Sequence, residues 1–177
     1  MVRSDARENR GRIMDAARAA FAETGDVSMN QIAQTAGVGA GTLYRHFPTR
    51  EALVLAVYQE EVERIVGSVT RLLTEMAPVD ALRFWTLDLV EAMRKKHGLG
   101  DAISASALHK LNEETYDPVI TAITQLLDAA KADGSIRPDA DPGDFLQFTG
   151  ALWRAQADGE NRAPRMLDLV IDGLETH

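Results

Sequence analysis

Apolar residues recur along most of the chain at the 3.6-residue spacing of amphipathic α-helices. The first stripe occupies positions i, i+3, i+4, i+7 and i+8 and consists of Ile13, Ala16, Ala17, Ala20 and Phe21. Gly25 follows it and is expected to end that helix, because glycine stops a helix readily. No segment shows the strict alternation of a half-buried strand, so the pattern predicts an all-α protein.

Further stripes predict a series of helices after the first. Thr49 is expected to cap a long helix that runs to the Pro78 stop, and Gly67 inside it predicts a bend or break. Asp80 is expected to cap the next helix, which Gly98 ends. The remaining pattern predicts helices at about 103–108, 116–132, 142–155 and 163–174.

Residues 28–47 predict two short helices joined by a glycine turn. Ser28 with Gln31 three residues later is a capping-box pattern, so a helix should begin at Met29. Its apolar face consists of Ile32, Ala33 and Ala36, to which Val38 and Leu43 are spaced to attach a second helix. Gly37 between them can adopt the left-handed conformation that ends a helix.

The second helix, roughly 40–47, is dense in hydrogen-bonding side chains for so short an element. It carries Thr42, Tyr44, Arg45 and His46, whereas an exposed helix more often carries Glu and Lys. A helix-turn-helix places its second helix in the DNA major groove. The segment is therefore interpreted as a DNA-reading device.

Two stretches of the sequence resemble a known family. AGVGAGTLYRHFPTREAL, preceded by RENRGRIMDAARAAFAETG, resembles the N-terminal domain of the TetR family of one-component transcriptional regulators over roughly residues 10–57. The resemblance implies an N-terminal helix-turn-helix DNA-binding domain over 1–50 and a C-terminal helical domain for ligand binding and dimerisation over 51–177. Beyond residue 57 it is one of length and layout.

The resemblance also implies which residues meet DNA. Thr42, Tyr44 and His46 match phosphate-holding positions, and Ala40, Gly41 and Arg45 are expected at the groove floor, where arginine can bind guanine bidentately. The alternatives are that Arg45 contacts only phosphate and that Tyr44 packs on the core. The full predicted set is Ser28, Met29, Gly39, Ala40, Gly41, Thr42, Tyr44, Arg45, His46, Thr49, Arg50 and Arg3.

The first and last residues of this predicted DNA-binding set depart most from the family pattern. Pro48 and Thr49 stand where many relatives carry lysine, and Arg50 is the candidate substitute. Arg3 and Arg7 are interpreted as an N-terminal arm that either enters the minor groove or is disordered.

The last two helices carry more apolar surface than an outer layer needs, and the resemblance implies that they pair with a two-fold mate. The predicted homodimer interface contains Phe145, Phe148, Leu152, Met166, Leu169, Val170 and Leu174. The alternative is that these residues form only the core of one chain. A dimer predicts a pseudo-palindromic operator with half-sites about one helical turn or somewhat more apart.

Aromatic and polar residues on the internal helices are the candidates for binding a small-molecule effector. They are Phe84, Trp85, Leu89, Met93, His109, Tyr116 and Trp153. The hypothesis is a repressor that a ligand releases from DNA, and the alternatives are an activator or a regulator that needs a corepressor. An apolar stripe of this kind also fits plain core.

Composition narrows the class of protein. The net charge is −8, but residues 1–50 balance to +2 and the remainder to −10, as expected for a DNA-facing head on an acidic body. There is no cysteine, so disulfides and zinc–thiolate sites are excluded. No apolar run approaches the roughly 20 residues of a membrane span. The expectation is a cytoplasmic bacterial protein without a cofactor.

The sequence leaves two other classes of function to consider, an enzyme and a protein-interaction module. An enzyme would need paired titratable groups. Asp101 has metal-pair spacing from His97 but lies across the Gly98–Gly100 break, and Glu113 follows His109 at i+4 as a lone carboxylate. No glycine-rich phosphate loop or nucleophile elbow occurs. We therefore expect neither catalysis nor a metal. A protein-interaction module that does not use the head would keep its activity when Tyr44 or Arg45 is changed.

Overall fold

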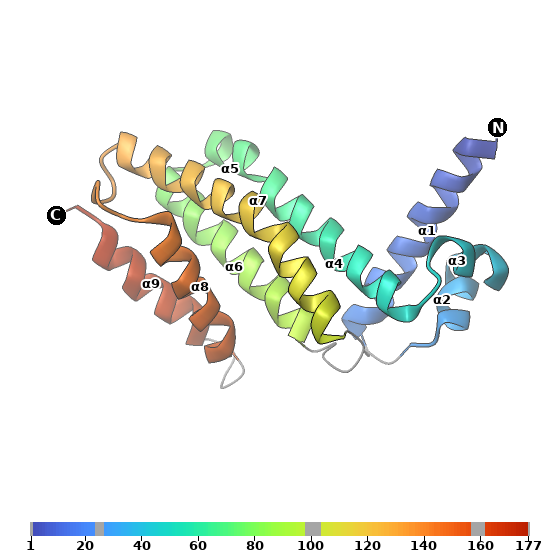
Figure 1. Ribbon diagram of the computed structural model, residues 1–177. Coiled ribbons are helices and arrows are strands. Elements are labelled where there is room, and N and C mark those ends of the chain that lie inside the picture. Colours follow the sequence, from blue (N-terminus) through green and yellow to red (C-terminus); the bar gives the residue numbers. More distant parts are fainter. Residues whose placement is uncertain (1, 24–26, 98–103, 157–161, 177) are drawn as a thin grey trace. The chain divides into compact units, whose positions relative to one another are not determined.

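A computed structural model of the chain describes residues 2–23, 27–97, 104–156 and 162–176. Within these ranges it is helical, apart from connecting segments and one isolated antiparallel bridge between Ile136 and Glu175 (Figure 1). The helices are α1 (Val2–Glu23), α2 (Met29–Thr35), α3 (Ala40–His46), α4 (Arg50–Gly67), α5 (Val69–Glu75), α6 (Pro78–His97), α7 (Ala105–Ala132), α8 (Pro142–Gln156) and α9 (Arg162–Leu174). The all-α prediction is confirmed.

The chain divides into two compact units, which are described separately. The head unit contains residues 1–60 and 95–111, and the bundle unit contains 61–94 and 112–177. None of the helices in the described ranges combines the length and the apolar character that crossing a membrane requires.

The core of the head unit lies where α1, α2 and α3 pack against one another. Alanines on α1 and α2 keep the facing surfaces small, so the helix backbones approach closely. The buried members are Ile13, Met14, Ala16, Ala17, Met29, Ile32, Ala33, Ala36, Leu43, Phe47 and Leu53. The apolar face predicted for the two short helices is confirmed.

In the bundle unit, a break separates α4 from α5 at Gly67 and Ser68, as the interior glycine predicted. Three donors converge on the Ile65 carbonyl beside it. They are the backbone N–H of Ser68 at 3.1 Å, its hydroxyl at 2.7 Å and the indole Nε1 of buried Trp85 at 2.9 Å. Trp85 therefore stabilises the break while its only polar group is satisfied.

Also in the bundle unit, α8 packs against α9. The backbone N–H of Arg137 donates to the Leu174 carbonyl at 2.8 Å, which ties the end of α9 to the segment that precedes α8. Arg83 of α6 pairs with Asp168 of α9 at 2.9 Å. The predicted bounds of both final helices agree with the structure to within one residue.

Three predicted boundaries were wrong. Residues 2–12 continue α1 instead of forming an arm, because helix-forming residues with a single interior glycine extend it. The helix predicted to begin after an Asp80 cap starts at Pro78, since proline suits the first helical position. The two helices predicted at 103–108 and 116–132 are one, α7, which tolerates Pro118 in its interior.

Tyr58 provides a test of packing in the head unit. Burial raises the pKa of Tyr58 to about 12. The phenol of the unfolded chain ionises near pH 10, so its contribution to stability is complete below that pH and is lost as the pH rises toward 12. We expect the free energy of unfolding to fall by about 1.4 kcal/mol by pH 11 from this group alone.

The measurement is urea unfolding of the wild type and Tyr58→Phe between pH 8 and 11. The variant lacks the ionising group, so the difference between the two proteins isolates its effect from that of the other titrating residues. Identical pH profiles would show that Tyr58 is not buried in this way.

Candidate nucleic-acid interface

The capping box at the start of α2 fixes where the helix-turn-helix begins. The backbone N–H of Gln31 donates to Ser28 Oγ at 3.2 Å, and the backbone N–H of Ser28 donates to Gln31 Oε1 at 3.0 Å. Two of the backbone donors at the helix start are thereby satisfied. This predicted cap is confirmed.

The turn between α2 and α3 depends on Gly37. Its φ of 64° lies in the left-handed region, where a side chain would be strained. The backbone N–H of Gly37 donates to the Gln34 carbonyl at 3.1 Å, and that of Val38 donates to the Ala33 carbonyl at 3.0 Å. The chain thus reverses within two residues, and α3 starts beside the helix that supports it.

The residues at the start of α3 carry almost no side-chain atoms. Gly39, Ala40 and Gly41 are all exposed, and a Cβ placed on either glycine would have no neighbour within 4 Å. One turn further on, Leu43 is fully buried and holds the helix to the core. The N-terminal part of a recognition helix is the part that contacts base edges. In this chain, Gly39, Ala40 and Gly41 form that part, and they present only backbone atoms and the methyl group of Ala40.

The polar residues of α3 lie outside the core. Tyr44 is 46% exposed, which contradicts the alternative that it packs on the core. Arg45 is exposed and folds back along its own helix: its Nε–H donates to the Gly41 carbonyl at 3.2 Å and its Nη2 donates to Thr42 Oγ1 at 3.1 Å. His46 is half-buried beside Phe47.

Some residues of the predicted DNA set have structural partners. The Met29 side chain is buried, which leaves only its backbone for a DNA contact. The Arg50 guanidinium donates to the Val27 carbonyl and lies 5.3 Å from the centre of the Phe21 ring. Its position therefore favours a role in holding the head together over a phosphate contact.

Two side chains at the start of α4 accept hydrogen bonds from backbone N–H groups. Thr49 caps the helix, as predicted, by accepting the Ala52 backbone N–H at 3.0 Å. The next acidic residue, Glu51, accepts the backbone N–H of Ser104 at 2.6 Å, and hydrogen bonding from Ser104 lowers the pKa of Glu51.

Positive charge remains available on the head. Arg18 is neutralised by Asp15 and Glu60 at 3.0 and 3.1 Å. Arg10 lies 5.0 Å from the centre of the Phe47 ring, and Arg7 is exposed on α1. In the ranges that the structure describes, neither of these two nor Arg12 or Arg45 forms an ion pair with a carboxylate. The Arg3 side chain lies outside the described residues.

The residues predicted to bind an effector differ in burial and come from both units. Phe84 and Tyr116 are 53% and 51% exposed, whereas Trp85 and Leu89 are buried and Met93 is half-buried. His109 is exposed and belongs to the head unit, and the Trp153 side chain lies outside the described residues. The effector set therefore remains a prediction.

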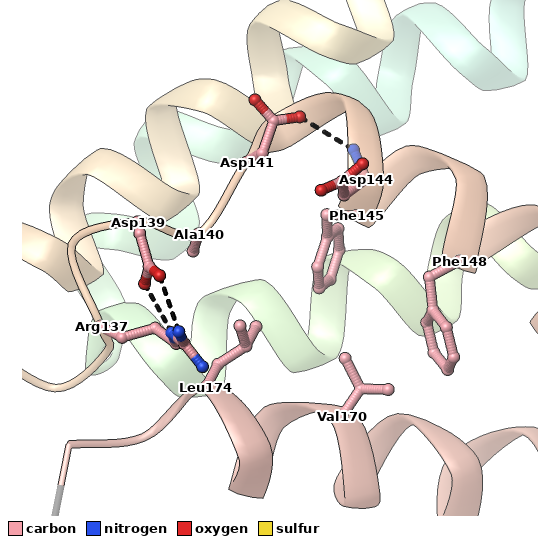
Figure 2. A pocket seen from close by; sticks show the side chains of 9 residues that line it. All are labelled: Arg137, Asp139, Ala140, Asp141, Asp144, Phe145, Phe148, Val170 and Leu174. Atoms are coloured by element: carbon pink, nitrogen blue, oxygen red, sulfur yellow. Dashed lines mark hydrogen bonds and ion pairs between the residues drawn. The ribbon is translucent and has the colours of Figure 1, made fainter.

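A pocket of about 340 Å³ lies elsewhere in the bundle unit, at the start of α8 and the end of α9 (Figure 2). Its apolar walls are Phe145, Phe148, Val170, Leu174 and Ala140, and its polar residues are Arg137, Asp139, Asp141 and Asp144. Arg137 and Asp139 form a two-pronged ion pair at 2.5 and 2.6 Å. In the sequence, this polar rim corresponds to the run RPDADPGD, where the hydrophobic pattern predicts only the start of the helix at about residue 142.

Four of the pocket residues, Phe145, Phe148, Val170 and Leu174, belong to the predicted dimer interface. Phe145 and Leu152 are buried within their own chain, as the one-chain alternative requires for those two. Leu169, in contrast, is 73% exposed, and Phe148, Met166, Val170 and Leu174 are half-buried. The outer flank of α9 therefore remains uncovered.

No group of three or more His, Asp or Glu side chains in the described ranges has the arrangement of a metal site. The exposed or half-buried hydroxyl, imidazole and guanidinium groups of α3 are of the kinds that contact phosphates and base edges in protein–DNA complexes.

Comparisons with known proteins agree with this geometry. Residues 13–57 match the family of bacterial regulatory proteins named tetR, and residues 77–176 match the C-terminal domain of SbtR-like transcriptional regulators. HTH-type transcriptional regulators of Staphylococcus aureus are 45% identical over 64 residues, and the match spans only 35% of this chain and 35% of each relative.

Two solved structures resemble nearly the whole chain. A TetR transcriptional regulator of Streptomyces coelicolor is 40% identical, with a TM-score of 0.80, over 94% of this chain and 98% of its own. A TetR regulator of Mycobacterium vanbaalenii is 33% identical, with a TM-score of 0.76, over 99% of this chain and 100% of its own.

Proposed function

Because the chain belongs to the TetR family of DNA-binding transcriptional regulators, we propose that it is a homodimeric repressor that binds a pseudo-palindromic operator and is released from it by a small molecule. It works in the bacterial cytoplasm, where operator DNA is found. The observation that carries the proposal is α3 itself: a buried Leu43 fixes the helix, and its start and the Arg45 side chain are exposed.

The proposed operator contacts fall into two groups. Tyr44, His46 and the capped start of α4 are suited to phosphates, because hydroxyl, imidazole and free backbone N–H groups at a helix end all donate to oxygen anions. The family resemblance implies the same role for Thr42. Arg45, with Ala40 and Gly41, is suited to the groove floor. Phosphate contacts set affinity and its salt dependence, and base contacts set sequence preference.

In-vitro selection from random and genomic duplexes tests operator binding. We expect an enriched inverted repeat, and we expect Arg45→Ala to lose the preference at one base pair of each half-site. Arg71→Ala is the matched control, since Arg71 is exposed in the bundle unit and paired with Glu75. Recovery of no preferred sequence would contradict the proposal and favour a corepressor-dependent regulator or an interaction module.

The proposed dimer is supported by the uncovered apolar flank of α9. Two copies that bury Leu169, Met166 and Val170 against one another would remove this surface from water, at roughly 25 cal/mol per Å² of apolar area. The same contact would hold two heads at a fixed separation, which a palindromic operator requires.

Leu169→Glu tests the dimer. The side chain is 73% exposed in one chain, so the variant should fold but remain monomeric, because a carboxylate would be buried in the interface. Operator affinity should fall on the order of 100-fold, since the second half-site no longer binds intramolecularly. Sedimentation velocity measures the assembly, and Asp172→Asn, exposed on the same helix, is the control. A dimeric Leu169→Glu protein would place the interface elsewhere.

Release by a ligand requires that the effector bind one dimer geometry better than the other. Coupling of ordinary size, about 1 to 3 kcal/mol, would weaken operator binding about 5- to 150-fold. The measurement is operator affinity across a panel of metabolites and antibiotics. Affinity that stays constant with every compound would argue for a constitutive regulator, and tighter binding would argue for a corepressor.

A further inference from the structure

Thr42 and Arg45 form a pair on one face of α3. They are three residues apart, a spacing that brings side chains together on a helix. Arg45 Nη2 donates to Thr42 Oγ1 at 3.1 Å and Arg45 Nε donates to the Gly41 carbonyl at 3.2 Å. The guanidinium is therefore held toward the N-terminal end of α3, where a recognition helix meets base edges.

The two bonds use one side of the guanidinium and leave another side free. Of its five N–H groups, the one on Nε and one on Nη2 are engaged within the helix. Both N–H groups of Nη1 and the second of Nη2 remain. One donor from each of these nitrogens forms a fork that matches the O6 and N7 acceptors of guanine.

The surroundings of the guanidinium keep that fork accessible. No carboxylate in the described part of the chain pairs with Arg45. Gly41 has no side chain, and its Cβ position faces open space. The Arg45 charge is thus fixed in direction without being neutralised.

We propose that Thr42 is a positioning residue, which aligns Arg45 to read a guanine in each operator half-site. The inference rests on the operator binding proposed above. It differs from the phosphate role that the family resemblance implied for Thr42. A phosphate contact holds every duplex equally, whereas alignment of Arg45 changes only the preference for guanine.

The experiment compares operator variants with the full-length protein. Affinities are measured for the selected operator, for the same duplex with the guanine changed to adenine, and for a duplex with 7-deazaguanine, which lacks the N7 acceptor. The proteins are the wild type, Thr42→Val, Thr42→Ser, Arg45→Ala and the double variant Thr42→Val with Arg45→Ala. Valine has the shape and helix propensity of threonine without the acceptor, and serine retains the acceptor.

We expect Arg45→Ala to lose about 5- to 150-fold in preference for guanine, the range for one bidentate contact. Thr42→Val should lose about 3- to 10-fold of that preference, the effect of one ordinary hydrogen bond. Thr42→Ser should restore it. The change should have no further effect in the Arg45→Ala background, and a smaller effect on the 7-deazaguanine duplex, which keeps only the O6 acceptor. The salt dependence of binding should stay unchanged.

Equal weakening of all duplexes by Thr42→Val would overturn the inference, because it is the signature of a phosphate contact, and it would leave operator binding intact. An unchanged preference in Thr42→Val would overturn it as well. If the wild-type protein selects no sequence at all, operator binding itself fails. Thermal unfolding of each variant separates these results from loss of the fold.

Discussion

The outward face of α3, which carries Thr42, Tyr44 and Arg45, depends on one buried contact, that of Leu43 with the core formed by α1 and α2. A seven-residue helix is not stable alone in water, because too few hydrogen bonds offset the cost of nucleating it. α3 is therefore formed by its burial. Once Leu43 is fixed, the 100° turn per residue determines which positions face outward, and the side chains of Thr42, Tyr44 and Arg45 take their directions from it.

The arginines of the head unit have two roles: some stabilise its packing, and others leave positive charge available at its surface. The net charge of residues 1–50 does not distinguish these roles. Of the seven arginines in residues 1–50, Arg10 and Arg50 lie over the aromatic rings of Phe47 and Phe21. A cation over a ring stabilises packing and keeps its charge. Arg18 forms ion pairs with two carboxylates, so its charge is neutralised. The +2 balance is thus a poor measure of the charge that DNA meets, and the positions of the unpaired arginines are a better one.

Local signals predicted the head well. The capping box, the left-handed Gly37 and the Thr49 cap each depend on neighbours in sequence, so they could be predicted without tertiary contacts. The same holds for the break at Gly67 in the bundle unit. Signals set by distant partners were not. The burial of Met29 and the Val27 carbonyl bound by Arg50 follow from packing between segments. The pocket beside α8 and α9 also needs elements far apart in the chain, and the sequence pattern did not reveal it.

The bare start of α3 has a consequence for divergence among related regulators. Gly39 and Gly41 face open space, and Ala40 carries only a methyl group. A larger side chain at these positions displaces no neighbour in the core, and at Gly41, inside the helix, replacing glycine costs nothing in backbone freedom. Duplicated copies of such a gene can therefore acquire new operator preferences at this edge by single substitutions, while the fold that presents the edge stays under separate constraint.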